Sequence, residues 1–205
     1  MIVKVRVIPN AVENEVVFRL SRGQGPMTFL HESFPMYHHP NYWGVHLTLM
    51  WALVAPLYRI WSSPCLLLIL QAVLVSGAAI PIYLALKSRI GASSAAALAL
   101  AYLLYPTTQH AMLHELHGIS WAVPFTAGFW WALRSGRRRW ALIFALLALS
   151  CREEILLVAA GLGLCLLAER GRRFRGLAVL LGAALAFHLL LNHVMPSLGQ
   201  SGDWR

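Results

Sequence analysis

The fold is decided by residues 134–175, RSGRRRWALIFALLALSCREEILLVAAGLGLCLLAERGRRFR, where an apolar stretch is interrupted by ionisable side chains and flanked by two arginine clusters. One straight helix over residues 140–168 would place Arg152, Glu153 and Glu154 near the bilayer centre, at a cost of about 2.5–3.5 kcal/mol each. It would also put the two arginine clusters on opposite sides of the membrane, whereas Lys and Arg collect on the cytoplasmic side. We therefore predict two short helices joined by a turn at residues 152–154, with both arginine clusters in the cytoplasm and the turn outside.

The rest of the chain is read by the same rule, because a lipid-spanning helix needs about 20 predominantly apolar residues. Four uncharged runs qualify, at residues 60–86, 90–114, 116–133 and 176–202. A fifth run, residues 43–58, is short, and we expect it to be an embedded or interfacial helix. The prediction is an all-α, polytopic transmembrane helix bundle of about five to seven hydrophobic helices, some short or re-entrant, that crosses the plasma membrane several times.

Composition excludes a water-soluble globule. Of the 205 residues, 59% are hydrophobic and 12% charged, against roughly a quarter charged in soluble domains. The net charge of +9 would raise the question of nucleic acid in a soluble protein, but the basic residues lie in short clusters between apolar runs. Cytoplasmic loops explain them better, so we expect membrane lipid and no nucleic acid as a partner. The sequence leaves the oligomeric state open.

Residues 1–22 have a different pattern, with β-branched alternation around a Pro-Asn turn. That pattern is typical of two short strands, and so short a segment builds no core of its own. We predict a loosely ordered, non-membrane N-terminal segment over residues 1–22, a helical membrane domain over residues 23–200, and a tail over residues 201–205.

Two polar clusters fall on the predicted outer face. In His114-Glu115-Leu116-His117 the histidines are three apart, so on a helix they share a face and can bind a divalent metal ion with Glu115 beside them. The alternative is an interfacial turn. In the second cluster, Glu153 and Glu154 near a helix N-terminus have a complete structural explanation in the helix dipole, whereas Arg152 can also hold a phosphate through its fork of donors.

An ordered set of short motifs resembles a family of predicted prokaryotic membrane proteins, domain of unknown function 2079, which looks related to the C-type glycosyltransferases. The motifs are Asn41-Tyr-Trp-Gly44-Val-His46, Ala55-Pro56-Leu57-Tyr58, Gln71-Ala72, Tyr102-Leu-Leu-Tyr105-Pro106, Glu115-Leu-His117 and Arg152-Glu153-Glu154. Where the family shows Asp-Phe-His-Pro and Lys-Glu-Asp, this chain has Glu115-Leu116-His117-Gly118 and Arg152-Glu153-Glu154, both conservative in charge. Family members are longer and begin with an extra span and an acidic outer loop, so we expect this chain to be a fragment.

The resemblance implies a membrane glycosyltransferase that takes sugar from a polyprenyl-phosphate donor on the outer membrane face. A carboxylate would remove a proton from an acceptor hydroxyl, with Glu115 as the preferred catalytic base and Glu32 as the second choice. Arg152, with or without a divalent metal ion, would neutralise the departing lipid phosphate. The substrate-binding residues implied are Arg152, Glu153, Glu154, His117, Asn41 and His46, and the metal ligands considered are His114 and His117.

Two alternatives to an enzyme are a transporter and a non-catalytic membrane module. A transporter predicts ionisable side chains at midplane depth that face a cavity, whereas in this sequence only His188 lies clearly inside a predicted span. A non-catalytic module would bind a partner through its outer loops.

Overall fold

The computed structural model describes residues 11–28, 41–113, 116–169, 171 and 173–200, and every regular element within them is helical. The elements are α1 (Ala11–Ser21), the 3₁₀ turn η1 (Tyr42–Gly44), α3 (Met50–Ile60), α4 (Pro64–Gly77), α5 (Ala79–Ile90), α6 (Ala92–Leu104), α7 (Pro106–Leu113), α8 (Gly118–Arg134), α9 (Arg138–Cys151), α10 (Ile155–Ala168), α11 (Arg173–Leu189), the π-helical turn η2 (Leu190–Val194) and α12 (Met195–Gln200). The prediction of an all-α bundle is therefore confirmed.

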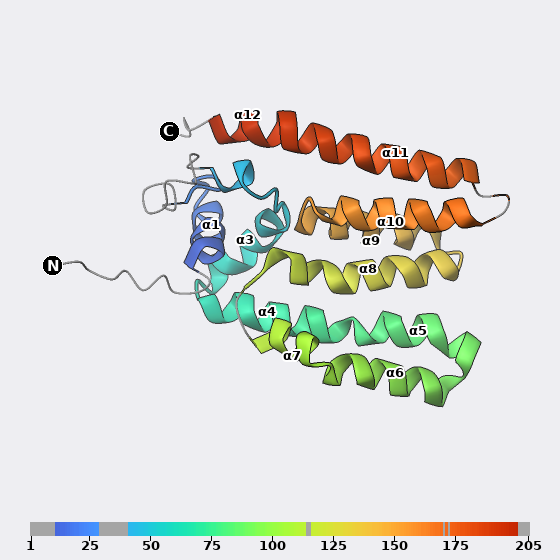
Figure 1. The fold of residues 1–205 in the computed structure, drawn as a ribbon. Helices are drawn as coiled ribbons and strands as arrows, with labels where there is room; N and C mark the ends of the chain where they lie inside the picture. The colour runs from blue at the N-terminus through green and yellow to red at the C-terminus, as the bar shows by residue number, and fades with distance from the viewer. Residues whose placement is uncertain (1–10, 29–40, 114–115, 170, 172, 201–205) are drawn as a thin grey trace.

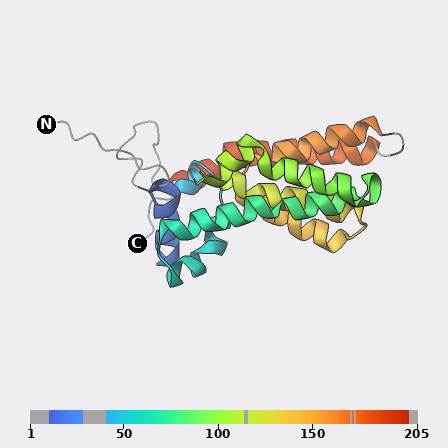
Figure 2. The same cartoon turned by 90° about the horizontal axis from the view of Figure 1, so that it is seen from below.

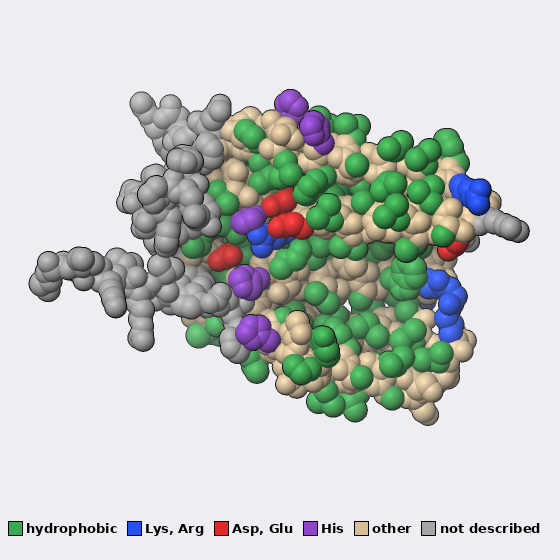
Figure 3. Space-filling view, viewed as in Figure 1, with side chains coloured by type: hydrophobic (Ala, Val, Ile, Leu, Met, Phe, Trp, Pro, Cys, Tyr) green, Lys and Arg blue, Asp and Glu red, His purple; other side chains and the backbone are tan. Residues whose placement is uncertain are grey.

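The long helices lie side by side, and three of their hairpins turn at the same end of the bundle (Figures 1 and 2). Each of these turns contains a glycine with positive φ, which side-chain-bearing residues rarely adopt: Gly91 at 82°, Gly136 at 69° and Gly171 at 84°. We call this the basic end, because Lys and Arg side chains gather there (Figure 3). Its described basic residues are Lys87, Arg89, Arg134, Arg137, Arg138, Arg139, Arg173 and Arg175.

The opposite end carries the other polar groups, and we call it the polar end. Histidine and acidic side chains gather toward it in Figure 3. Its residues used below are Glu13, Asn41, Tyr42, His46, His117, Arg152, Glu153 and Glu154. Helices α1 and α3 pack together across this end (Figure 1), and α12 packs against η1.

Two stretches of the described chain are long and apolar enough to cross a membrane, Pro64–Ile90 and Arg173–Gly199, each of 27 residues. The first begins at Ser63, whose hydroxyl accepts the Cys65 N–H, with Pro64 in the first helical turn. In their most apolar windows only 22% and 11% of the residues are buried. Most of this apolar surface therefore faces outward, as lipid contact requires.

The predicted hairpin over residues 140–168 is confirmed. Helix α9 ends at Cys151 and α10 begins at Ile155, while Arg152 between them has an extended backbone with φ −168° and ψ 151°. Both helices have 14 residues, about 21 Å at 1.5 Å per residue, which is shorter than the hydrocarbon core. The run 43–58 becomes η1 and the 11-residue α3, which is also too short to cross.

Two sequence expectations are wrong. Residues 90–114 do not form one helix, because the chain breaks at Tyr105, whose ψ of 126° is extended before Pro106 starts α7. The strands expected within residues 1–22 are replaced by helix α1 over the described part of that segment. This helix is not loosely attached: Val16 and Val17 are fully buried, and the Tyr58 hydroxyl of α3 donates to the Asn14 side chain. Tertiary packing has overridden the local β propensity.

The buried core lies near the polar end. Its largest side chains include Trp51 of α3 and Trp121 of α8, whose rings meet edge to face at 5.0 Å. Gln71 of α4 is fully buried beside them: its Nε2 donates to the Ala111 carbonyl at 2.8 Å, and its Oε1 accepts the His117 N–H at 3.0 Å and the Trp121 indole N–H at 3.3 Å. This amide therefore joins α7 and the start of α8 to a membrane helix.

Candidate functional site at the polar end

His46 is positioned by the turn that precedes α3. The Asn41 side chain caps η1 by accepting the Trp43 N–H at 3.0 Å, and its amide donates to the Leu198 carbonyl of α12 at 3.0 Å. The turn continues as the His46 N–H donates to the Tyr42 carbonyl at 2.8 Å. Asn41 is fully buried, so the contacts described for it hold the turn together and thereby place His46 at the site.

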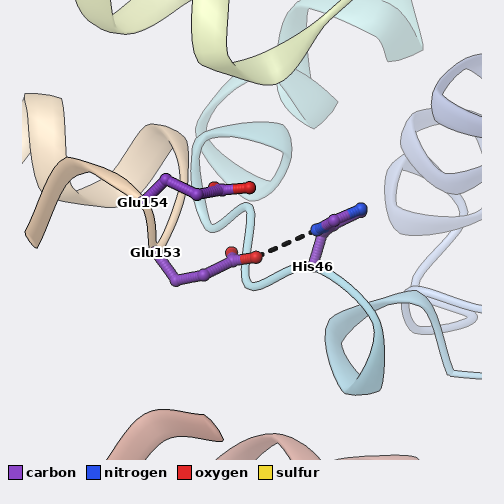
Figure 4. A group of neighbouring side chains, drawn as sticks. All are labelled: His46, Glu153 and Glu154. Atoms are coloured by element: carbon purple, nitrogen blue, oxygen red, sulfur yellow. Dashed lines mark hydrogen bonds and ion pairs between the residues drawn. The ribbon is translucent and has the colours of Figure 1, made fainter. Parts of the chain in front are cut away.

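Glu153 is the most buried charged side chain of the site, 5% exposed. Its Oε1 lies 2.9 Å from His46 Nδ1 (Figure 4), and its Oε2 accepts the Leu47 N–H at 3.0 Å. Burial alone would raise the pKa of Glu153, but the hydrogen bonds from His46 and from backbone N–H groups outweigh it and hold that pKa below its ordinary value. The hydrogen bonds around Glu153 therefore favour its ionised form.

Arg152 adds a cation to this pair. Its Nη2 lies 2.7 Å from His46 Nε2, and its Nε lies 3.1 Å from Glu154 Oε2. Because His46 Nδ1 faces the Glu153 carboxylate, the consistent tautomer carries the ring proton on Nδ1 and leaves Nε2 to accept from Arg152. Of the Arg152, Glu153 and Glu154 side chains, Glu154 is the most exposed, at 39%. The site can thus bind an anion at Arg152 or a cation at its carboxylates.

Glu13 brings a further carboxyl to the polar end from α1. The Tyr42 hydroxyl lies 3.5 Å from its Oε1. Burial raises the pKa of Glu13 above its ordinary value, although the charges of His117, Arg152 and His46 oppose that rise. The pKa of Tyr42 is raised as well, by burial and by the Glu13 charge. A carboxyl whose pKa is raised by burial is suited to proton transfer.

An apolar cavity of about 350 Å³ adjoins this cluster, between the ends of α9 and α10 and the facing part of α11. Glu153 is the polar residue in its lining. The other lining residues are Leu47, Leu149, Leu156, Ala186, Leu189 and Leu190. A molecule in this cavity would meet mainly hydrocarbon side chains and one carboxylate.

The structure brings together His46, Arg152, Glu153 and Glu154, four of the residues predicted to bind substrate. His117 begins α8 at the same end and is exposed. The predicted catalytic residues Glu115 and Glu32, and the predicted metal ligand His114, lie outside the described residues. Their roles stay predictions.

Sequence reasoning missed Glu13 and Tyr42. Tyr42 stands inside one of the motifs quoted above and could have been selected from it. Glu13 carried no such signal, because the segment that contains it was interpreted as strands and its contact with Tyr42 joins residues 29 positions apart.

A family model described as "Predicted membrane protein (DUF2079)" matches residues 16–205. No curated protein and no solved structure matches the chain.

Proposed function

The chain belongs to the DUF2079 family of predicted membrane proteins, and from this premise we propose that it is a membrane glycosyltransferase that takes a sugar from a polyprenyl-phosphate donor. The observation that carries the proposal is the junction of two unlike surfaces. The apolar cavity has Glu153 in its lining, and both Glu153 and the Arg152 guanidinium contact His46. A lipid phosphate would lay its apolar chain in the cavity and place its anionic head on the Arg152 guanidinium, away from the Glu153 carboxylate.

The two ends of the bundle give the proposed orientation. Both arginine clusters belong to the basic end, and Lys and Arg are retained on the cytoplasmic side. The polar end then faces outward from the plasma membrane, with the chain crossing several times. Lipid-linked sugars would reach the cavity laterally from the outer leaflet.

The proposed reaction is a direct transfer. The acceptor hydroxyl oxygen forms a bond to the anomeric carbon while the bond from that carbon to the phosphate oxygen breaks. The lipid phosphate leaves with the bonding electrons, and Arg152 stabilises its charge through paired N–H donors. A carboxylate takes the hydroxyl proton. Glu115 and Glu32 stay the bases predicted from the sequence, and among the described residues the position and raised pKa of Glu13 favour it for this role.

The position of charge along the helices favours a transferase over a transporter. Helices α4, α6 and α10 contain no Asp, Glu, Lys or Arg, and in α5, α8, α9 and α11 these residues stand in the terminal turns at the basic end. A path for ions or protons needs ionisable groups at mid-depth. Within the described helices, the charged side chains are instead gathered at the two ends.

The test compares one arginine from each end in the full chain reconstituted into lipid vesicles. Arg152→Gln should lower transfer from a polyprenyl-phosphate-linked sugar by about 10²–10³-fold, the usual effect of removing one donor to a developing anion. Arg139→Gln, at the basic end, should leave the rate within about twofold of wild type. The Arg152→Gln variant should also bind a polyprenyl phosphate without sugar more weakly than the wild type does.

Equal transfer by both variants would contradict the proposal, as would inactivity of the wild type toward a panel of polyprenyl-linked sugars. A melting curve of each variant separates loss of the donor group from loss of the fold.

A further inference from the structure

We propose that His46, Glu153 and Glu154 bind a first-row divalent metal ion, Zn²⁺ or Mn²⁺, in place of the Arg152 guanidinium, which now contacts His46 and Glu154. The site shares residues with the proposed transferase. The proposal nevertheless concerns binding of the ion alone, so its failure and the failure of sugar transfer are measured separately.

The three side chains converge from two separate segments, the turn before α3 and the connection between α9 and α10 (Figure 4). One ligand atom from each lies within 4.8 Å of the others. Tetrahedral ligand atoms about 2.0–2.2 Å from Zn²⁺ are roughly 3.4 Å apart. The three ligand atoms in this structure therefore need to approach one another by about 1 Å or slightly more. The half-exposed Glu154 can make most of that movement by changing rotamer.

The donor set suits these ions. One imidazole nitrogen with two carboxylates is a nitrogen and oxygen set of the kind that binds Zn²⁺ and Mn²⁺, and three protein ligands leave an open position for a further oxygen ligand. Glu153 is held for this purpose by the Leu47 N–H, which bonds the carboxylate oxygen that does not face His46. Such outer contacts orient a ligand and strengthen its binding to metal.

The Arg152 guanidinium fills this cation position with incomplete bonding. Its Nη2 lies 2.9 Å from His46 Nδ1 and 2.7 Å from Nε2, although the nitrogen that carries the ring proton cannot accept. Its Nε and Glu154 Oε2 are 3.1 Å apart, yet both atoms are buried without a hydrogen-bond partner. A divalent ion bound at His46 Nδ1 would take the place of the ring proton that faces Glu153, and the proton would move to Nε2 once the guanidinium withdraws. The ion would bind one carboxylate oxygen each of Glu153 and Glu154, and the released guanidinium would be available to an anion in the site.

This position differs from the metal site predicted from sequence at His114 and His117. Within the part of the chain that the structure describes, His46, Glu153 and Glu154 are the group of three metal-ligating side chains whose donor atoms converge. The two alternatives therefore predict different histidines.

The experiment titrates Zn²⁺, and separately Mn²⁺, into the chelator-treated full chain in detergent micelles and measures binding by calorimetry. The wild type should bind one ion per chain. His46→Gln and Glu154→Gln should each weaken binding on the order of 10²-fold, whereas His110→Gln and Glu169→Gln, exposed side chains outside the cluster, should leave it unchanged. Absence of binding for both ions, or equal affinity of the His46 and Glu154 variants and wild type, would overturn the site.

Two further variants sharpen the result. Arg152→Gln removes the competing cation and should tighten Zn²⁺ binding on the order of tenfold, since a unit charge a few ångströms away opposes the ion strongly. A merely structural cluster would instead bind no more tightly after this change, and that outcome rejects displacement of the guanidinium. Loss of binding in His117→Gln with retention in His46→Gln would assign the ion to the sequence-predicted pair and overturn the proposal.

Discussion

At the basic end the chain reverses through Gly91, Gly136 and Gly171, and arginines stand in the terminal turns of the helices. At the polar end it reverses through buried, hydrogen-bonded side chains. The glycine turns need only backbone freedom, and nothing described lies within 4 Å of where their Cβ atoms would stand. The turn at Arg152 instead depends on partners from the segment before α3, more than a hundred residues earlier.

The cations at the basic end make local contacts. The guanidinium of Arg137 lies 5.0 Å from the centre of the Trp131 ring, and that of Arg134 lies 5.6 Å from the Trp130 ring. Arginines over tryptophans are typical of the region where a helix leaves the hydrocarbon. The contacts at this end are therefore local, whereas the hydrogen bonds at the polar end join segments far apart in the sequence.

The largest effect is expected in an experiment that tests whether the two ends lie on opposite sides of the membrane. In a chain whose exposed Cys65 and Cys165 are replaced by serine, we introduce either His117→Cys at the polar end or Ser135→Cys at the basic end. A membrane-impermeant maleimide added to intact cells should label the cysteine at position 117 more than tenfold faster, because Lys and Arg retain the other end inside. Labelling of position 135 from outside, with position 117 silent, would reverse the orientation and reject the proposed outer site.

The next effect tests the hydrogen bonds of the polar end. Gln71→Leu leaves a carbonyl, a backbone N–H and an indole N–H without their partner, at about 1–3 kcal/mol each. We expect Tm to fall by about 10 °C in detergent, at roughly 2–4 °C per kcal/mol for a chain of this size. The matched change Gln109→Leu, at an exposed position, should shift Tm little. Equal changes in Tm for the two variants would show that the buried hydrogen bonds of Gln71 do not stabilise the fold.

A smaller effect is expected from close packing of α10 against α11. A Cβ added at Gly176 would lie 2.6 Å from the Leu167 backbone nitrogen and 2.8 Å from the Gly163 carbonyl oxygen, so one helix must shift. Gly176→Ala should destabilise the chain by about 1–3 kcal/mol, measured as thermal unfolding. Gly182→Ala, in the same helix with open space around it, should be neutral or slightly stabilising. If Gly182→Ala destabilised the chain more than Gly176→Ala, α10 and α11 would not be packed as described.

The smallest effect concerns Glu13 and pH. The folded-state pKa of Glu13 is raised by burial, so its contribution to stability is complete below the pKa of the unfolded chain and is lost as pH rises through the folded-state value. Glu13→Gln resembles the protonated form. It should therefore melt like wild type at pH 4 and at a higher temperature than wild type at pH 8. A variant that is less stable at pH 8 would indicate that the ionised form of Glu13 is held by the nearby cations.

The helix pattern of the membrane part could be predicted locally. Residues 152–154 interrupt an apolar run between two arginine clusters, and burial of charge in lipid is costly enough to determine the turn from composition alone. The same reasoning counted residues 90–114 as one span, although Pro106 removes a backbone donor and keeps Tyr105 extended. It also treated residues 1–22 as isolated, although Val16 and Val17 are buried in a core that other helices provide.

For the candidate site, the sequence by itself determined which residue types face the same end of the bundle, since the membrane sorts apolar from charged segments along the chain. Only the tertiary structure decided which of them meet: His46 with Glu153 across 107 positions, and Tyr42 with Glu13 across 29. It also decided that Glu153 lines a cavity together with residues of α11. The physical reason is that lipid solvation acts on each segment separately, whereas a hydrogen bond at 2.9 Å depends on how several segments pack together.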